Sequence, residues 1–170
     1  HLVELGKAKV HREMKRKFYA DDLPTQKKLL ETVINHIVRL IDGVGCISCR
    51  NGQKKLNAGH YHSVGSSKNL RYNLFNIFTQ CESCNSYKSS NKTEYDNGLI
   101  SVYGHEIYEY VKFGIVRQYP LLQIKLDKIR DAIVKAREIE KELVKADRTY
   151  NVLERLELRK VFNERIGIYE

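Results

Sequence analysis

The sequence lacks tryptophan, has one methionine and two prolines, and contains no long hydrophobic run. No stretch approaches the roughly 20 consecutive apolar residues that a membrane-spanning helix needs, and the first residues show no signal-peptide pattern. We therefore expect a soluble, cytoplasmic protein. The scarcity of proline and a charged fraction of 30% favour a helix-rich fold. Because the sequence begins at His1 rather than at methionine, we expect further residues before it.

Acidic residues are also scarce. Thirty Lys and Arg residues oppose 21 Asp and Glu residues, which gives a net charge of +9 and a pI of about 9.3. Most of this excess lies between Arg50 and Thr93, where seven basic residues face Glu82 alone. Such a field attracts polyanions, most often nucleic acid, and makes binding dependent on salt. The alternative is surface charge that serves solubility.

A helix is predicted for DDLPTQKKLLETVINHIVRLIDG, which follows a basic stretch, residues 2–20, that we interpret as an arm or a helix. Asp22 or Thr25 would cap the helix near Pro24, and Gly43 would end it. Its apolar residues recur at helical spacing: Leu29, Leu30, Val33, Ile37 and Leu40.

Residues 44–93 break this helical period. KKLNAGHYH (54–62) and FNIFTQ (75–80) predict two short strands, with the polar loop SVGSSKNLRYNL between them. CESCNSYKSSNK predicts a turn followed by a helix. Beyond Asn97-Gly98 the pattern is helical again, and GHEIYEYVKFG predicts a short helix.

Two further helices are predicted towards the C-terminus, the second over roughly residues 150–165. The first carries apolar residues close to an a/d heptad, interrupted by Glu140 at a d position: Leu122, Leu126, Ile129, Ile133, Ala136 and Leu143. Two interpretations remain equally open, a helical hairpin folded on the core of the same chain and a dimer contact. Two heptads are fewer than the three or four that indicate a coiled coil.

All four cysteines fall into two CxxC pairs, Cys46–Cys49 and Cys81–Cys84. A two-residue spacing lets a tight turn point both thiolates at one centre, and two such turns complete the tetrahedron that zinc prefers. Disulfides, a redox CxxC and an iron–sulfur cluster are the alternatives, the first disfavoured in a reducing compartment. A zinc ion with four sulfur ligands has no open position, so we expect a structural rather than a catalytic zinc.

The order of residues around the cysteines resembles the HNH, or ββα-metal, nucleases. This order is CxxC, a strand with His60, Asn76 five residues before the second CxxC, and Asn85 directly after it. More closely, the stretches CISC, AGHYHSVGSSKNLRYNLFNIFTQCESCN, SSN, YDNGL and YG resemble the NinG (Rap) recombination endonucleases of lambdoid phages. The pattern covers residues 46–104, and the basic segment before it and the charged helix after it resemble the family in character.

The resemblance implies a role for each matching residue. His60 would be the general base that takes a proton from the attacking water, which suits a neutral imidazole near neutral pH. Asn85 would lie in one cleft with His60 and would be a ligand of a divalent ion, Mg²⁺ or Mn²⁺, that binds the scissile phosphate. Asn76 would orient His60. The residues expected to contact DNA phosphates are Arg71, Lys68, Lys88, Lys92 and Arg50.

One position departs from the HNH pattern. Many HNH enzymes have an acidic metal ligand directly before the base, where this sequence has Gly59. Amide and imidazole groups alone would bind Mg²⁺ weakly, which favours a contribution from the DNA phosphate, or a transition ion such as Mn²⁺. The alternatives that would complete the ligand set are His62, Asn73, Asn91 or a distant carboxylate such as Glu94 or Asp96. Each residue also has a purely structural alternative. His60 would be a packed or hydrogen-bonded residue, His62 a surface residue and Asn85 a turn residue.

The sequence thus predicts an α+β fold in which a zinc-clipped ββα-metal core (HNH, treble-clef-like), residues 44–104, lies between a basic arm and helix, residues 1–43, and C-terminal helices, residues 105–170. The function that the resemblance implies is a structure-specific endonuclease for branched DNA such as D-loops and Holliday junctions, acting in the host cytoplasm if phage-encoded. Cutting two strands of a junction needs two active sites, so we expect a homodimer. The alternatives are a non-catalytic zinc-stabilised DNA-binding module, which Gly59 supports, and an RNA-binding zinc ribbon.

Overall fold

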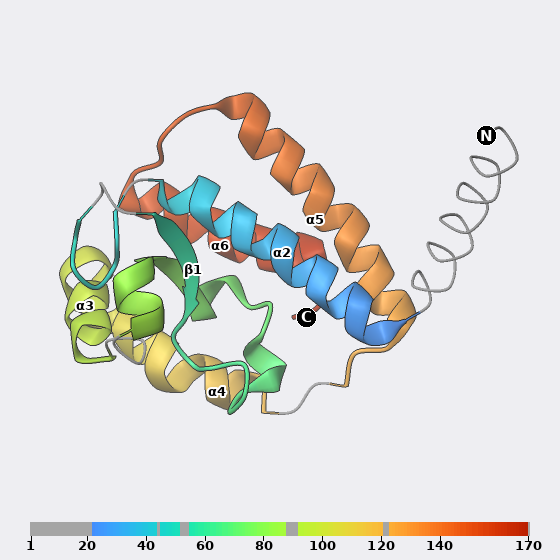
Figure 1. The fold of residues 1–170 in the computed structure, drawn as a ribbon, viewed down its shortest axis with the longest axis horizontal. Coiled ribbons are helices and arrows are strands. Elements are labelled where there is room, and N and C mark those ends of the chain that lie inside the picture. Colours follow the sequence, from blue (N-terminus) through green and yellow to red (C-terminus); the bar gives the residue numbers. More distant parts are fainter. Residues whose placement is uncertain (1–21, 44, 52–54, 88–91, 121–122, 170) are drawn as a thin grey trace, which may run out of the picture.

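The computed structural model describes residues 22–43, 45–51, 55–87, 92–120 and 123–169. The predicted basic arm, Lys88 and Asn91 lie outside the described residues. In Figure 1, helices α2, α5 and α6 form one side of the molecule, and the small sheet with α3 and α4 forms the other. No helix among the described residues is long and apolar enough to cross a membrane.

Helix α2 (Leu23–Asp42) is the predicted first helix. The side chain of Asp22, not that of Thr25, caps its start, because the Asp22 carboxylate accepts a hydrogen bond from the Thr25 N–H at 3.1 Å. Gly43 ends the helix with a φ of 65°, a conformation that favours glycine. One face of the helix is fully buried and forms the centre of the larger core: Leu30, Ile34, Ile37, Val38 and Ile41.

The sheet consists of two antiparallel strands, β1 (Leu56–His60) and β2 (Ile77–Cys81), in which His60 pairs with Ile77 and Leu56 with Cys81. Strand β1 is shorter than the predicted segment 54–62, and β2 is offset towards the C-terminus from the predicted segment 75–80. The residues between them form two short 3-10 turns, η1 (Lys68–Leu70) and η2 (Leu74–Asn76). All of β2 is buried, because α2 covers one face of the sheet and the aromatic core of α3 covers the other.

Helical structure resumes earlier than predicted. After the π-helical turn η3 (Ser83–Tyr87), α3 runs over Lys92–Glu109, so Asn97-Gly98 lies inside a helix. The predicted helix over residues 104–114 corresponds to the helical segment after Gly104, which interrupts α3 with a φ of 86°. A π-helical turn, η5 (Tyr110–Gly114), and α4 (Ile115–Gln118) follow. Gly98 is required because a Cβ there would collide with the carbonyl oxygen of Ile47, between the first two cysteines.

Helices α5 (Leu126–Ala146) and α6 (Val152–Ile166) pack against α2. The heptad-like face of α5 is buried within the chain: Ile129, Ala132, Ile133, Ala136, Ile139 and Leu143. Glu140, which interrupts the heptad, forms an ion pair with His36 of α2 at an Oε1–Nδ1 distance of 2.5 Å. Of the two interpretations of this apolar stripe, intrachain packing therefore describes the observed arrangement.

Candidate metal centre and nucleic-acid interface

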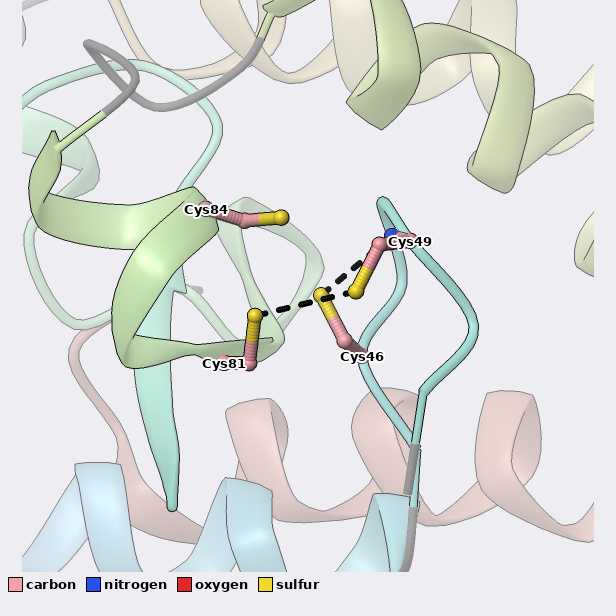
Figure 2. A group of neighbouring side chains, drawn as sticks. All are labelled: Cys46, Cys49, Cys81 and Cys84. Atoms are coloured by element: carbon pink, nitrogen blue, oxygen red, sulfur yellow. Dashed lines mark hydrogen bonds between the residues drawn. The ribbon is translucent and has the colours of Figure 1, made fainter. Parts of the chain in front are cut away.

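The two CxxC pairs face each other across a small gap. Figure 2 shows Cys46 and Cys49 on a loop after α2, and Cys81 and Cys84 at the end of β2 and in η3, with their sulfurs directed towards a common centre. All four Sγ atoms lie within 4.8 Å of one another, and the Cys49 and Cys81 sulfurs are 3.7 Å apart. Sulfurs bound to one zinc at about 2.3 Å are separated by about 3.8 Å in a tetrahedron. The four cysteines can therefore bind a zinc ion.

Main-chain contacts hold the two cysteine loops in place. The Ile47 N–H donates to the Thr79 carbonyl at 2.8 Å, which attaches the first loop to β2, and Leu56 packs against the buried cysteines. Burial alone would raise the pKa of Cys81, but hydrogen bonds from the Cys84 N–H and the neighbouring thiols lower this pKa to about 7. A thiol that ionises near neutral pH is suited to metal binding.

His60 is the last residue of β1 and is half-buried. Its Nε2 lies 2.9 Å from the carbonyl oxygen of Arg71. Since a carbonyl only accepts, Nε2 must carry the proton, which leaves the lone pair of the neutral ring on Nδ1. Burial lowers the pKa of His60 and outweighs the opposing effect of this hydrogen bond, so the imidazole is neutral at pH 7.

Asn76 is fully buried beside His60's strand and bonds three main-chain groups. Its Oδ1 accepts from the His62 N–H at 2.8 Å, and its Nδ2 donates to the carbonyls of His62 and Leu70 at 3.0 and 3.1 Å. The Asn76 side chain thus joins the main chain of His62 to that of Leu70, which precedes Arg71.

A basic pocket of about 310 Å³ is lined by Arg71, the residue whose carbonyl accepts from His60; His60 itself is not part of the lining. Its cations are Lys27, Lys68 and Arg71, and the remaining lining residues are Tyr72, Gln123 and Ile124. Arg71 Nη2 bonds a carboxylate oxygen of Glu31 at 2.6 Å, while Arg71 Nε is buried and has no hydrogen-bond partner among the described residues. Sequence reasoning missed Lys27 and Glu31, because α2 lies about 40 residues from Arg71 along the chain.

Asn85, the predicted ligand of the divalent ion, lies beside Gly59. A Cβ at position 59 would be 3.1 Å from Asn85 Oδ1 and would meet the side-chain amide of Gln80, whose Nε2 donates to Ser48 Oγ at 2.7 Å. Two amide oxygens, those of Gln80 and Asn85, therefore converge where many HNH enzymes carry an acidic ligand. No cluster of His, Cys, Asp and Glu other than the four cysteines is found among the described residues.

The structure does not bring Asn85 and His60 into contact. Successive side chains of a strand point to opposite faces of a sheet, and Ala58, on the same face as His60, packs against the core around α2. His60 is therefore on the α2 side of β1, and position 59 is on the other side, where the Tyr95 hydroxyl donates to the Gly59 carbonyl at 2.9 Å. Within the described parts of the chain, no hydrogen bond joins His60 to Asn85.

The other residues expected to complete the ion's ligand set have partners of their own. His62 Nε2 donates to the Val111 carbonyl at 2.9 Å, and burial lowers the pKa of this histidine. Asp96 accepts from the hydroxyls of Tyr61 and Tyr108 and lies near two lysines. The Asn73 Oδ1 accepts from Phe75 N–H and from Asn163. Glu94 is exposed on α3.

The remaining basic residues are spread over the surface. Lys68 and Arg50 are exposed, and Arg50 Nη2 donates to Ser101 Oγ at 2.7 Å. Lys92 lies over the ring of Tyr61; burial lowers its pKa to about 8, although Asp96 acts in the opposite direction. The four predicted phosphate contacts among the described residues thus lie in three different places: Lys68 and Arg71 at the basic pocket, Arg50 by the cysteines and Lys92 near Tyr61.

Comparison with known proteins places this arrangement in context. Residues 5–147 match the model of a family described as "Bacteriophage Lambda NinG protein". Protein ninG of Escherichia phage lambda is 34% identical over 87 residues, which cover 50% of this chain and 43% of that protein. Protein ninG of Salmonella phage P22 is 34% identical over 79 residues, 45% of this chain and 39% of that protein. The matched region thus spans less than half the length of these relatives. No solved structure matches the chain significantly.

Proposed function

This chain belongs to the NinG family of bacteriophage proteins, and on that premise we propose that it is a metal-dependent HNH endonuclease. The substrate class is branched DNA formed in recombination, D-loops and Holliday junctions. Hydrolysis of a phosphodiester bond leaves a 5′-phosphate and a 3′-hydroxyl. The resemblance of residues 46–104 to the HNH pattern motivates this reaction, and the surroundings of His60 support it.

One observation carries the proposal: a neutral imidazole with its lone pair on Nδ1 is bonded to the main chain of Arg71, which lines a pocket together with Lys27 and Lys68. The pocket residues Lys27, Lys68 and Arg71 attract a phosphate. A base and a phosphate site in such proximity are the two elements that hydrolysis of a phosphodiester requires.

In this proposal each residue has a defined task. His60 Nδ1 takes the proton from a water that attacks the phosphorus, and the Arg71 carbonyl fixes the ring through Nε2. Asn76 is a positioning residue, because it sets the path of the main chain directly after His60. Arg71 and Lys68 hold the phosphate. Glu31 keeps the Arg71 guanidinium in place at 2.6 Å.

A divalent ion, Mg²⁺ or Mn²⁺, would be held by Asn85 Oδ1, with the Gln80 amide oxygen beside it. When bound, it supplies charge stabilisation at the phosphate and at the leaving oxygen. This donor set has no carboxylate, so it suits an ion that is bound only together with the DNA phosphate.

The four cysteines would bind one structural zinc ion. The ion would join the loop after α2 to the turn that carries Asn85, and would hold both against β2. The first prediction of this role is a stoichiometry of one zinc per chain.

A second candidate function is a zinc-stabilised DNA-binding module without catalysis. The specific observation that favours it is Gly59, whose neighbourhood contains amides but no carboxylate. A nicking assay on a four-way junction with Mg²⁺ or Mn²⁺ separates the two functions. Junction binding without any cleavage by the unmodified protein would establish the module and exclude the nuclease.

We also propose that the protein acts as a homodimer, since paired cuts need two active sites. The apolar stripe of α5 packs inside the chain, so a dimer would use other surfaces; exposed apolar side chains on α5 and α6 are Val134, Val144 and Leu153. Sedimentation analysis at micromolar concentration, with and without junction DNA, tests this proposal. A monomer in both conditions would exclude it.

A further inference from the structure

A second polar cavity, of about 220 Å³, lies between the first cysteine loop, α3 and α6. It is lined by Asp42, Gly45, Cys46, Ile47, Arg50, Thr79, Val102, Tyr103 and Arg155. None of these residues lines the basic pocket that contains Arg71. Lys27 of that pocket and Asp42 of this cavity lie 15 residues apart in α2, which corresponds to about 22 Å along the helix axis. The two sites are therefore at opposite ends of the same helix.

Buried polar atoms at this cavity lack partners among the described residues. Thr79 is 1% exposed and lines the cavity, and its hydroxyl has no hydrogen-bond partner. Directly behind Asp42, the fully buried Arg159 uses Nη2 on the Asp42 carboxylate at 2.7 Å and leaves Nε and Nη1 without partners. Such atoms destabilise a fold unless water satisfies them. Because each of them is closed to solvent, the donors that a ligand in the cavity could reach belong to other residues.

Two more arginines border the cavity, and neither forms an ion pair within the described residues. Arg155 Nε donates to the Tyr150 carbonyl at 2.8 Å, and Arg50 Nη2 donates to Ser101 Oγ at 2.7 Å. Asp42 is the single acidic residue of the lining, and its charge is matched by Arg159. The arginines at positions 50 and 155 thus give the cavity a positive charge, and their planar guanidinium groups suit a phosphate.

We propose that this cavity binds a second phosphate of the DNA backbone, with Arg50 and Arg155 as the cationic donors. The inference rests on the proposed DNA substrate, but not on cleavage. Because the cavity and the basic pocket are about 22 Å apart along α2, one phosphate cannot occupy both. Two anchoring points at this distance fix the protein on its substrate, so that a backbone segment held at the cavity directs another segment to His60.

The experiment measures the affinity of the full chain for a fluorophore-labelled four-way junction by anisotropy, over a series of salt concentrations. Arg155→Gln should weaken binding about 5-fold or more at moderate salt and reduce the slope of log K against log salt by about 1. Arg148→Gln is the matched control, because it removes the same charge from an exposed residue that lies outside the cavity lining and pairs with Glu154 and Tyr150. The control should bind like the unmodified protein. Equal affinities of the two variants would overturn the inference.

A further variant keeps the test decisive if Arg155→Gln unfolds. Arg50 is exposed, so Arg50→Gln removes a charge without disturbing the core, and it should also weaken binding relative to Arg148→Gln. Equal affinities of Arg50→Gln and Arg148→Gln would overturn the inference. A protein that binds junctions through these residues but never cuts them would contradict the proposed nuclease and leave this inference intact.

Discussion

His60 and Arg71 are joined by a hydrogen bond of 2.9 Å between the imidazole Nε2 and the main-chain carbonyl oxygen. This bond does two things at once. It sets the tautomer, so that Nδ1 is the basic nitrogen, and it places the imidazole next to the residue whose guanidinium lines the basic pocket. The proposed base and the proposed phosphate site are thus connected through a single residue.

The pH dependence of stability follows from the lowered pKa of His60. The unfolded chain takes up a proton near pH 6.5, whereas burial shifts the pKa of the folded protein below this value. Below pH 6.5 the unfolded state therefore binds more protons, and stability falls as the pH falls; above pH 6.5 the contribution is fully present. Urea unfolding at pH 7.5 and 5.5 measures this loss. Because the His62 pKa is lowered too, His60→Gln should reduce the loss without abolishing it. An equal loss in the variant would contradict the assignment.

Asn76→Ala should destabilise the protein by about 3 kcal/mol, because three main-chain groups lose their partner in a buried place. Chemical denaturation measures the change. Asn69→Ala serves as control, since Asn69 is only half-buried and its side chain makes one hydrogen bond, to the Tyr119 carbonyl. If the two variants lost the same stability, the clamp attributed to Asn76 would be wrong.

Zinc should bind with a stoichiometry of one ion per chain, and Cys81→Ser should abolish it. The lowered pKa of Cys81, about 7, makes this thiol a ready ligand at neutral pH. Metal content by mass spectrometry of the purified protein gives the stoichiometry. Chelation should also lower the thermal midpoint, because the ion joins the loop after α2 to β2 and η3. Full stability of a metal-free protein would exclude a structural zinc.

Gly98→Ala should separate α3 from the first cysteine loop. A Cβ at this position would collide with the Ile47 carbonyl oxygen, which is main chain and cannot move aside cheaply. We expect a loss of about 1–3 kcal/mol together with weaker zinc retention. Gly65→Ala is the control, since its Cβ would approach nothing closer than Ser63 Oγ at 3.9 Å. A stability of Gly98→Ala equal to that of the control would show that the helix tolerates the side chain.

Local sequence patterns predicted those structural features that residues close together in the sequence determine. The amphipathic period of α2, its cap at Asp22 and the convergence of two CxxC pairs are written in short stretches of sequence. The residue pairs that join distant helices could not be predicted in this way, because their members are far apart in the sequence. His36 and Glu140 are separated by 104 residues, and Asp42 and Arg159 by 117. Such contacts depend on how helices pack, which periodicity does not encode.

The candidate site likewise combines residues that the sequence predicted with neighbours that it did not predict. Its motif residues could be named from sequence, but their surroundings could not. Glu31 and Lys27 come to Arg71 from α2, and Gln80 comes to Gly59 from the paired strand. Asn97-Gly98 misled the prediction of helix bounds. An Asn-Gly pair is typical of a turn, but here it lies inside α3, where Gly98 allows close packing against the Ile47 carbonyl. The opposite faces of His60 and position 59 follow from strand geometry that the resemblance alone does not supply.

Single-turnover cleavage of a four-way junction tests the central claim most directly. The unmodified protein, loaded with zinc and supplied with Mg²⁺ or Mn²⁺, should nick the junction and leave 5′-phosphate ends. His60→Ala should bind the same junction with unchanged zinc content but cut it about 10²–10⁴-fold more slowly, the contribution expected of a general base. Cleavage by His60→Ala at the rate of the unmodified protein, or binding by the latter without any cleavage in either metal, would contradict the account.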